Sequence, residues 1–318
     1  MVKFTFSRNH NAKGTKGQDP SQWPSVAKAT QEANLFRYYY LPYLYSIFFD
    51  VSMYGGTVVR PVFFEFTTDP ETHHIWDQFM WGNAMMIIPV YQQGVAEVSG
   101  YLPYTTPWYS LRNSDYATLP KPGYNIFSAP TNDLIPVFAR GGVIIPRQRP
   151  NTTTVTSRQN PLELLITIGL FFSDSICSDF DKIDGPAKSA GTLYWDDGES
   201  IVQDFENYNY FQWVFEFVHT SERAALYITP KRTAKGLTVP SIDILDIIGY
   251  HYKADLDEAM LNGKPAKISL QTSHYDSLRS RLLIKTTNLL EIGKAAPGSK
   301  LTLSWPHQET GFCDEYLC

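Results

Sequence analysis

Apolar positions recur with two different periods along the chain, and the change of period divides it in two. Between residues 26 and 51 they repeat every three or four positions, which predicts helix. Asp19-Pro20 is a typical helix start, and Gly55-Gly56 ends the pattern. Pro42 removes a backbone hydrogen bond inside this segment, so we expect two helices or one kinked helix.

Two shorter segments follow the helical pattern. Residues 57–64 read TVVRPVFF, and this β-branched and aromatic run with little alternation predicts a strand buried on both faces, as in a parallel sheet. Pro61 weakens that prediction, because proline cannot donate to a sheet. Asp69-Pro70 then starts a second helical pattern, which runs to Phe79 and ends at Gly82.

From residue 84 onward, apolar and β-branched runs alternate with clusters of Gly, Pro, Asn and Asp, a spacing typical of β-sandwiches. The predicted strands cover residues 85–90, 95–102, 135–139, 143–145, 162–172, 191–195, 210–219, 224–229, 243–250, 281–286 and 300–305. The chain is therefore predicted to be a helix–strand–helix piece followed by mainly β structure.

The composition is that of a folded globular protein, with 43% hydrophobic, 14% aromatic and 19% charged residues. A formal net charge of −5 without a basic run disfavours nucleic acid as a partner. The longest apolar runs, residues 85–90 and 164–172, are shorter than the ~20 residues that a membrane span needs, so we predict no span. The first residues lack a signal-peptide pattern, which leaves a cytosolic protein and a start further upstream both open.

Cysteines and glycine-rich motifs give no sign of a metal or a cofactor. Cys177, Cys313 and Cys318 lack metal-ligand spacing, and no nucleotide-binding glycine pattern is present. We therefore expect no cofactor and no zinc site. Cys313 and Cys318 either close a small terminal loop in an oxidising compartment or remain free thiols. Asn151-Thr152-Thr153 is an N-glycosylation triplet, which makes Asn151 a glycosylation candidate.

Candidate chemistry appears first at the segment FSRNHN. Residues 3–7 can form a short strand, and Arg8, Asn9 and His10 would then lie where that strand ends, the position from which barrel enzymes project functional groups. Arg8 and His10 can hydrogen-bond hydroxyls or a carboxylate. The alternative is a loop in which backbone groups satisfy both side chains.

Two other polar groups are interpreted as structural. Residues 195–199 read WDDGE and offer three carboxylates, but Asp-Gly between a strand and another apolar run is a hairpin-turn signature. We interpret this segment as a turn. His73-His74 lies in the second helical pattern without a third ligand, so we expect a solvated face there.

Seven segments of the sequence can be recognised as a set. They are FSRNHNAKGTKGQDP, RYYYLPYLYSIFF, TVVRPVFFEF, DQFMWGNAMMIIPV, YLPYTTPWY, ARGGVIIPRQRPNTTTVTSRQNPLELLITIG and LYWDDGES. They occur in the same order as in glycoside hydrolase family 31, and the sequence resembles this family over roughly residues 4 to 215. After Phe217 the resemblance fades to β character alone.

The resemblance implies a retaining α-glucosidase, with a (β/α)₈ barrel whose two Asp residues act as nucleophile and acid/base. Both Asp segments precede the RNHN segment in the family, and neither is in this sequence. We therefore expect no catalytic residue in this chain. The resemblance implies that His10 binds the sugar in the −1 subsite, with Arg8 as support for His10.

The same resemblance predicts three domains and a mainly β fold. Residues 1–66 would be the last part of the (β/α)₈ barrel, residues 67–139 a proximal C-terminal β domain, and residues 140–318 a distal C-terminal β-sandwich domain. Without the rest of a barrel, the first domain should expose a large apolar patch to water. We expect it to include Leu44, Phe48, Val58, Val59, Val62 and Phe63.

The functional expectation follows from the resemblance. In the complete enzyme the partners would be α-linked glucosides or oligosaccharides, and the compartment lysosomal or secretory. The chain alone should be inactive, because retention needs two carboxylates flanking the bond. The alternative is a non-catalytic carbohydrate-binding or β-sandwich protein derived from such an enzyme.

Overall fold

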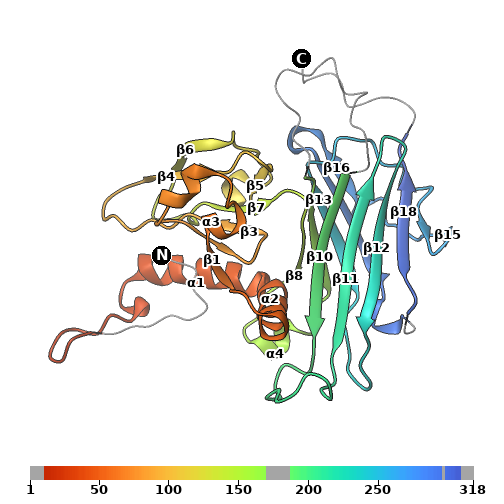
Figure 1. Ribbon diagram of the computed structural model, residues 1–318, viewed down its shortest axis with the longest axis horizontal. Coiled ribbons are helices and arrows are strands. Elements are labelled where there is room, and N and C mark those ends of the chain that lie inside the picture. The colour runs from red at the N-terminus through yellow and green to blue at the C-terminus, as the bar shows by residue number, and fades with distance from the viewer. Residues whose placement is uncertain (1–10, 170–186, 296–297, 309–318) are drawn as a thin grey trace.

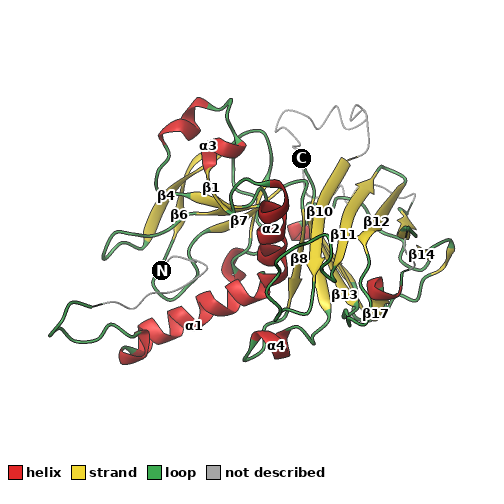
Figure 2. Cartoon of the chain, turned by 60° about the horizontal axis from the view of Figure 1, so that its bottom comes forward, coloured by secondary structure: helices red, strands yellow, loops and turns green. Residues whose placement is uncertain are grey.

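The computed structural model describes residues 11–169, 187–295 and 298–308. These residues form a smaller β body, a larger β-sandwich and a pair of helices, so the fold is mainly β, as predicted (Figure 1). The helix pair runs along the smaller body and reaches the sandwich (Figure 2).

The predicted helical segment forms two consecutive helices, α1 (Pro24–Tyr39) and α2 (Leu41–Tyr54), behind a short 3₁₀ turn, η1 (Pro20–Gln22). Asp19 caps η1, because its side chain accepts a hydrogen bond from the Ser21 N–H. Tyr40 interrupts the helices, and Pro42 lies in the first turn of α2, where its missing N–H costs nothing. The prediction of a break near Pro42 is confirmed.

The smaller body is an antiparallel five-stranded sheet in the order β1-β2-β3-β7-β5, accompanied by a two-stranded sheet of β4 and β6. Their bounds are β1 (Val59–Pro61), β2 (Phe79–Trp81), β3 (Met85–Ile87), β4 (Glu97–Leu102), β5 (Trp108–Ser110), β6 (Gly123–Ser128) and β7 (Val137–Arg140). Two short helical segments join them, α3 (Val62–Glu65) and η3 (Asn113–Asp115).

Two predictions in this body are wrong. Residues 57–64 do not form a buried parallel strand, because β1 spans three residues, pairs antiparallel with β2 and passes into α3 directly after Pro61. Proline has no N–H with which to extend the ladder, and this limits the strand. The helix expected from Asp69 to Phe79 is only a 3₁₀ segment, η2 (Pro70–His74), because Phe79 already pairs with Ile87 as part of β2.

The predicted β-sandwich is confirmed for the described part of residues 144–306. One sheet has the order β10-β11-β12-β18-β14-β15, and the other has the order β16-β17-β13-β9-β8. The first contains β10 (Ala187–Trp195), β11 (Phe211–His219), β12 (Arg223–Arg232), β14 (Met260–Leu261), β15 (Lys264–Pro265) and β18 (Leu301–Pro306). The second contains β8 (Ile144–Gln148), β9 (Leu162–Thr167), β13 (Ile242–Ile248), β16 (His274–Asp276) and β17 (Arg281–Leu290).

The sandwich core lies between these sheets and follows from strict alternation. Every second residue of β11 is buried, including Trp213, Phe215 and Phe217. These rings meet side chains such as Leu245 and Ile284 of the opposite sheet in one hydrophobic cluster. Most strand pairs are antiparallel, but β9 and β13 run parallel, so the chain must cross between them. Short helices α4 (Thr154–Ser157), η5 (Ser277–Arg279) and η6 (Ile292–Lys294) connect the strands.

The helix pair is covered by β structure on one side, so the expected apolar patch is confirmed for some of its members and wrong for others. Helix α2 contacts β8 and β10, and its buried side includes Leu44 and Phe49. Val62 is fully buried in the smaller body as well. Other members of the expected patch remain exposed, namely Phe48, Val59 and Phe63 at 44%, 41% and 37%.

Candidate functional site

Arg8 and His10 lie outside the described residues, as do Cys177, Cys313 and Cys318. The nearest described residue is Asn11, whose side-chain amide donates to the Thr15 carbonyl oxygen at 2.9 Å. From there the chain leads through η1 into α1 and α2. The described residues therefore include the helices that follow the RNHN segment and the contacts that hold these helices in place.

One buried carboxylate joins α2 to the sandwich. Asp196 is 1% exposed, and its Oδ2 accepts hydrogen bonds from the hydroxyls of Tyr45 and Tyr194, both at 2.7 Å. Its Oδ1 accepts from the Gly198 N–H at 2.8 Å. Because three donors satisfy it, this carboxylate is held in place and is structural.

The neighbouring Asp197 organises the loop after β10. Its Oδ1 accepts from the N–H groups of Glu199 and Ser200, both at 3.0 Å, and its Oδ2 accepts from the Ser200 hydroxyl. The Ser200 side chain and these N–H groups hold the pKa of Asp197 well below its ordinary value. The carboxylate therefore stays ionised and bound to its own loop.

The interpretation of WDDGE as turn chemistry is confirmed by these bonds. The connection is longer than a two-residue hairpin, because β10 ends at Trp195 and β11 begins only at Phe211. The two strands pair antiparallel along their length. Asp196 and Asp197 thus shape a long hairpin loop and hold it against α2.

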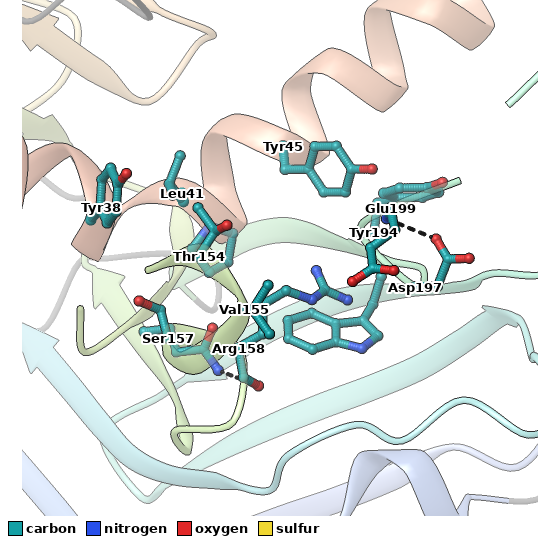
Figure 3. Close-up of a pocket in the computed structure, with 14 residues that line it drawn as sticks. Tyr38, Leu41, Tyr45, Thr154, Val155, Ser157, Arg158, Tyr194, Asp197 and Glu199 are labelled. Atoms are coloured by element: carbon teal, nitrogen blue, oxygen red, sulfur yellow. Dashed lines mark hydrogen bonds between the residues drawn. The ribbon is translucent and has the colours of Figure 1, made fainter. Parts of the chain in front are cut away.

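A pocket of about 300 Å³ opens where the α1–α2 junction, α4 and this loop meet (Figure 3). We call it the helix-junction pocket. It is lined by Tyr38, Leu41, Pro42, Tyr45, Gln148, Thr154, Val155, Ser157, Arg158, Tyr194, Trp195, Asp197, Gly198 and Glu199. Its walls combine aromatic rings, aliphatic side chains and both signs of charge.

Arg158 is the cation of this pocket. Its guanidinium lies 3.9 Å from the centroid of the Trp195 ring and donates a hydrogen bond to the Asp196 carbonyl oxygen. Burial lowers the pKa of Arg158, while the Asp196 carboxylate opposes that change. An arginine remains charged under these conditions, so the pocket keeps a fixed positive group.

A second set of charges lies at the junction between α1 and the sandwich. Arg147 on β8 is 4% exposed, and its Nε and Nη2 form ion pairs with Glu163 Oε2 at 3.1 Å and Asp246 Oδ2 at 2.6 Å. Glu163 is also the hydrogen-bond acceptor of the Tyr39 hydroxyl at the end of α1. This buried network links α1 to β8, β9 and β13.

Asp246 completes the network with two further partners. Arg281 on β17 donates to its Oδ1 at 2.7 Å, and the Tyr116 hydroxyl donates to its Oδ2 at 2.7 Å. Tyr116 belongs to the smaller body, so one carboxylate connects that body with the sandwich. All three guanidinium nitrogens of Arg147, and both oxygens of Glu163 and of Asp246, have a partner of opposite charge or a hydroxyl.

The remaining sequence candidates are exposed. His73 and His74 lie on the surface, with His73 Nε2 3.0 Å from the Thr67 carbonyl oxygen, which agrees with a solvated face. Among the described residues no group of three His, Cys, Asp or Glu side chains is arranged to hold a metal ion. Asn151 is exposed just before α4, and its Oδ1 accepts from the Thr152 N–H at 2.8 Å.

Comparison with known proteins identifies the family. Residues 2–47 match the TIM-barrel domain of glycosyl hydrolases family 31, and residues 55–145 match the family 31 C-terminal domain. The chain belongs to glycoside hydrolase family 31. The two matches follow each other along the helix pair and the smaller body, so both family 31 domains meet within residues 2–145.

Several curated proteins are similar to this family 31 chain. It is 37% identical to intestinal sucrase-isomaltase of Rattus norvegicus over 197 residues, 62% of this chain and 10% of that protein. It is 39% identical to alpha-glucosidase of Aspergillus niger over 202 residues, 62% of this chain and 19% of that protein. It is 35% identical to lysosomal alpha-glucosidase of Mus musculus over 217 residues, 63% of this chain and 21% of that protein. The matched region therefore spans a tenth to a fifth of these relatives.

Solved family 31 structures share the fold. The Flavobacterium johnsoniae GH31 dextranase complexed with glucose aligns with a TM-score of 0.69 and 19% identity, over 89% of this chain and 33% of the dextranase. The catalytic subunit in the glucosidase II heterodimer aligns with a TM-score of 0.65 and 18% identity, over 90% of this chain and 29% of that subunit. In the described part of this family 31 chain, no helix is long and apolar enough to cross a membrane.

Sequence reasoning did not find the residues that build the junction of this family 31 chain. It recognised WDDGE as a turn but did not identify the contacts of Asp196 with α2, and it did not single out Arg158, Arg147 or Asp246. The partners of Asp196 include Tyr45, which is 151 positions away. A buried Asp or Arg within an apolar strand was the available signal, since such residues need a partner of opposite charge.

Proposed function

We propose that this chain is part of a retaining α-glucosidase in which His10 binds the sugar at the bond to be cleaved and Arg8 supports His10. The observation that carries the proposal is the succession of two family 31 matches, from the barrel domain into the C-terminal domain. Residues 8 and 10 fall inside the first match. Similarity to α-glucosidases over this region supports the substrate class.

In this proposal the described residues act as a scaffold. The RNHN segment is followed by α1 and α2, which are fixed to β9 and to the end of β10 by Tyr39, Tyr45 and their buried carboxylate partners. A rigid support matters because substrate ligands must hold their geometry closely for catalysis. The three domains, residues 1–66, 67–139 and 140–318, would then be a barrel end, a proximal β domain and a distal β-sandwich.

We further propose that the polypeptide of 318 residues does not hydrolyse α-glucosides by itself. Retention of configuration needs two carboxyl groups ~5–5.5 Å apart on opposite faces of the sugar. Asp196 and Asp197, in the loop after β10, are committed to hydrogen bonds within the fold. A lone histidine cannot serve as both nucleophile and general acid.

Two hydrolysis assays test this function. The 318-residue polypeptide should release no product from an aryl α-glucoside, whereas a polypeptide that also contains the upstream barrel segments should be active. In the longer polypeptide, His10→Ala should lower kcat as well as kcat/KM, because a hydrogen bond to a sugar hydroxyl strengthens in the transition state.

His73→Ala is the matched control, since His73 is exposed and its Nε2 lies 3.0 Å from the Thr67 carbonyl oxygen of its own segment. The control should retain the activity of the parent. Loss of thermal stability without loss of kcat in His10→Ala would contradict the role of His10. Turnover by the 318-residue polypeptide that disappears with Asp196→Asn would contradict the assignment of WDDGE to a structural turn.

The substrate, compartment and modification belong to the same proposal. α-Linked glucosides or oligosaccharides would be the substrates, and the compartment would be lysosomal or secretory. The lysosomal alpha-glucosidases among the relatives support such a route. Asn151 would carry an oligosaccharide there, and its exposure is compatible with that modification.

A further inference from the structure

We propose that the helix-junction pocket is a binding site for a neutral sugar, a glucosyl unit of an α-linked oligosaccharide. That ligand class rests on the proposed function, whereas the site itself rests on the lining of the pocket. The pocket is formed by residues 38–45, 148–158 and 194–199, none of which belongs to the RNHN segment. Its volume of about 300 Å³ lies at the lower end of the range of small-molecule sites.

The apolar part of the pocket suits the C–H face of a pyranose ring. Tyr45 is 37% exposed, and it projects over the pocket from α2 (Figure 3). Leu41 and Pro42 continue this wall, and Val155 on α4 lines the opposite side with 56% of its surface exposed. Aromatic and aliphatic groups that stay open to water inside a concave site gain free energy when a ligand face covers them.

The polar part offers donors and acceptors to hydroxyl groups. Among the described residues, the Arg158 guanidinium donates one hydrogen bond, to the Asp196 carbonyl oxygen, and it has five N–H groups in all. The remaining N–H groups are therefore available to sugar oxygens. The exposed Glu199 carboxylate, on the loop after β10, can accept from sugar hydroxyls.

The balance of charge selects a neutral ligand. Arg158 is one cation, and the carboxylates of Asp197 and Glu199 line the same pocket. The Ser200 side chain and backbone N–H groups keep the pKa of Asp197 low, so it is ionised at neutral pH. A phosphate or carboxylate ligand would meet two negative charges for one positive charge, whereas a polyhydroxylated ligand can bond to both signs.

The pocket is formed before any ligand arrives. Asp196 accepts hydrogen bonds from the hydroxyls of Tyr45 and Tyr194 and so fixes them. The Arg158 guanidinium packs against the Trp195 ring, 3.9 Å from its centroid. These groups lose little side-chain freedom when a ligand binds, because they are already ordered by the fold. A preformed lining of this kind favours a specific site over an incidental hollow.

Isothermal titration of the 318-residue polypeptide with maltotriose tests the proposal. We expect saturable binding with a dissociation constant of about 1 mM. Arg158→Gln should weaken it about tenfold, because a hydrogen bond to a charged group contributes about that much. Glu199→Gln should weaken it about threefold, and Val155→Trp should abolish it by filling the pocket.

Matched controls lie outside the pocket. Glu258→Gln removes an exposed carboxylate elsewhere, and Ile201→Trp adds an indole at a residue that is 89% exposed on the same loop. Both should bind maltotriose like the parent. Thermal melting of each variant separates loss of binding from loss of folding. Val155→Trp changes an exposed side chain that takes no part in the contact between Trp195 and Arg158.

Four results would overturn the proposal. They are no saturable binding up to about 20 mM maltotriose, equal losses in the control variants, tighter binding of inorganic phosphate than of maltotriose, and loss of binding in His10→Ala but not in Val155→Trp. The last result would assign the sugar to the RNHN segment instead. Hydrolysis tests the proposed function and equilibrium binding tests the pocket, so the two can fail separately.

Discussion

Asp246→Asn is expected to destabilise the protein severely, because it removes one charge from a buried pair without removing the other. Asp246 is fully buried and bonds to Arg147, Arg281 and Tyr116. After the substitution, the guanidinium of Arg147, itself 4% exposed, keeps Glu163 but loses its shortest ion pair. Breaking a buried pair in this way costs about 3–5 kcal/mol.

The magnitude translates into an observable shift in melting temperature. About 3–5 kcal/mol in a domain of this size lowers Tm by about 10 °C. Asp276→Asn is the matched control, since it breaks an ion pair with Arg279 that is half exposed. An exposed pair contributes ~0–1 kcal/mol, so the control should melt within about 2 °C of the parent.

The same carboxylate makes stability depend on acid. Burial alone would raise the pKa of Asp246, but the charges and hydrogen bonds of Arg147 and Arg281 outweigh burial and hold its pKa below the ordinary 3.8. A depressed pKa stabilises the folded state above pH 3.8, and this contribution is lost as the pH falls through the lower folded pKa. Asp246→Asn should remove this part of the acid dependence.

Urea unfolding followed by tryptophan fluorescence, together with calorimetry between pH 3 and pH 7, measures both effects. A loss of stability in Asp246→Asn no larger than in Asp276→Asn would refute the reasoning about the buried network. A double replacement of Arg147 by Met and Asp246 by Leu should recover part of the lost stability, because a buried pair can be exchanged for apolar groups at little cost.

Three further predictions concern other parts of the chain. His219 is buried, and burial is the main cause that lowers its pKa to about 4. The free energy of unfolding should therefore fall as the pH drops from 6.5 to 4, and His219→Phe should flatten that part of a plot of Tm against pH. Gly191→Ala should prevent the normal approach of β10 to β8, since a Cβ there would lie 2.0 Å from the Ile144 carbonyl oxygen; a melting temperature within a few degrees of the parent would contradict this. After expression through a secretory route, Asn151 should carry an oligosaccharide. Enzymatic deglycosylation should then lower the mass of the parent but leave the mass of Asn151→Gln unchanged.

Local patterns were sufficient for the elements whose causes are local. The break before Pro42, the cap at Asp19 and the alternating burial of β11 depend on neighbours a few positions away. The prediction of a long buried strand at residues 57–64 was wrong for a local reason too. Pro61 ends the strand, and the prediction gave too little importance to this proline. Phe79 was assigned to a helix although pairing with Ile87 decides its conformation.

The junction could not be predicted in the same way. Asp196 reads as a turn residue, and its acceptance of a bond from Tyr45 depends on how α2 lies against β10. Asp246 reads as one of two polar residues in an otherwise apolar strand, and its partners come from three other segments. These contacts are set by tertiary packing, which a single sequence without an alignment does not reveal.

The parallel pairing of β9 with β13 has a consequence for biosynthesis. Residues 162–167 must wait for residues 242–248 to leave the ribosome before they can pair, and β18, which lies between β12 and β14, is made last of all the described strands. Until these strands have been made, the inner faces of β11 and β12 expose large aromatic and aliphatic side chains. At about 5–20 residues per second, that interval lasts for several seconds, during which this exposed apolar surface makes the nascent chain prone to aggregation.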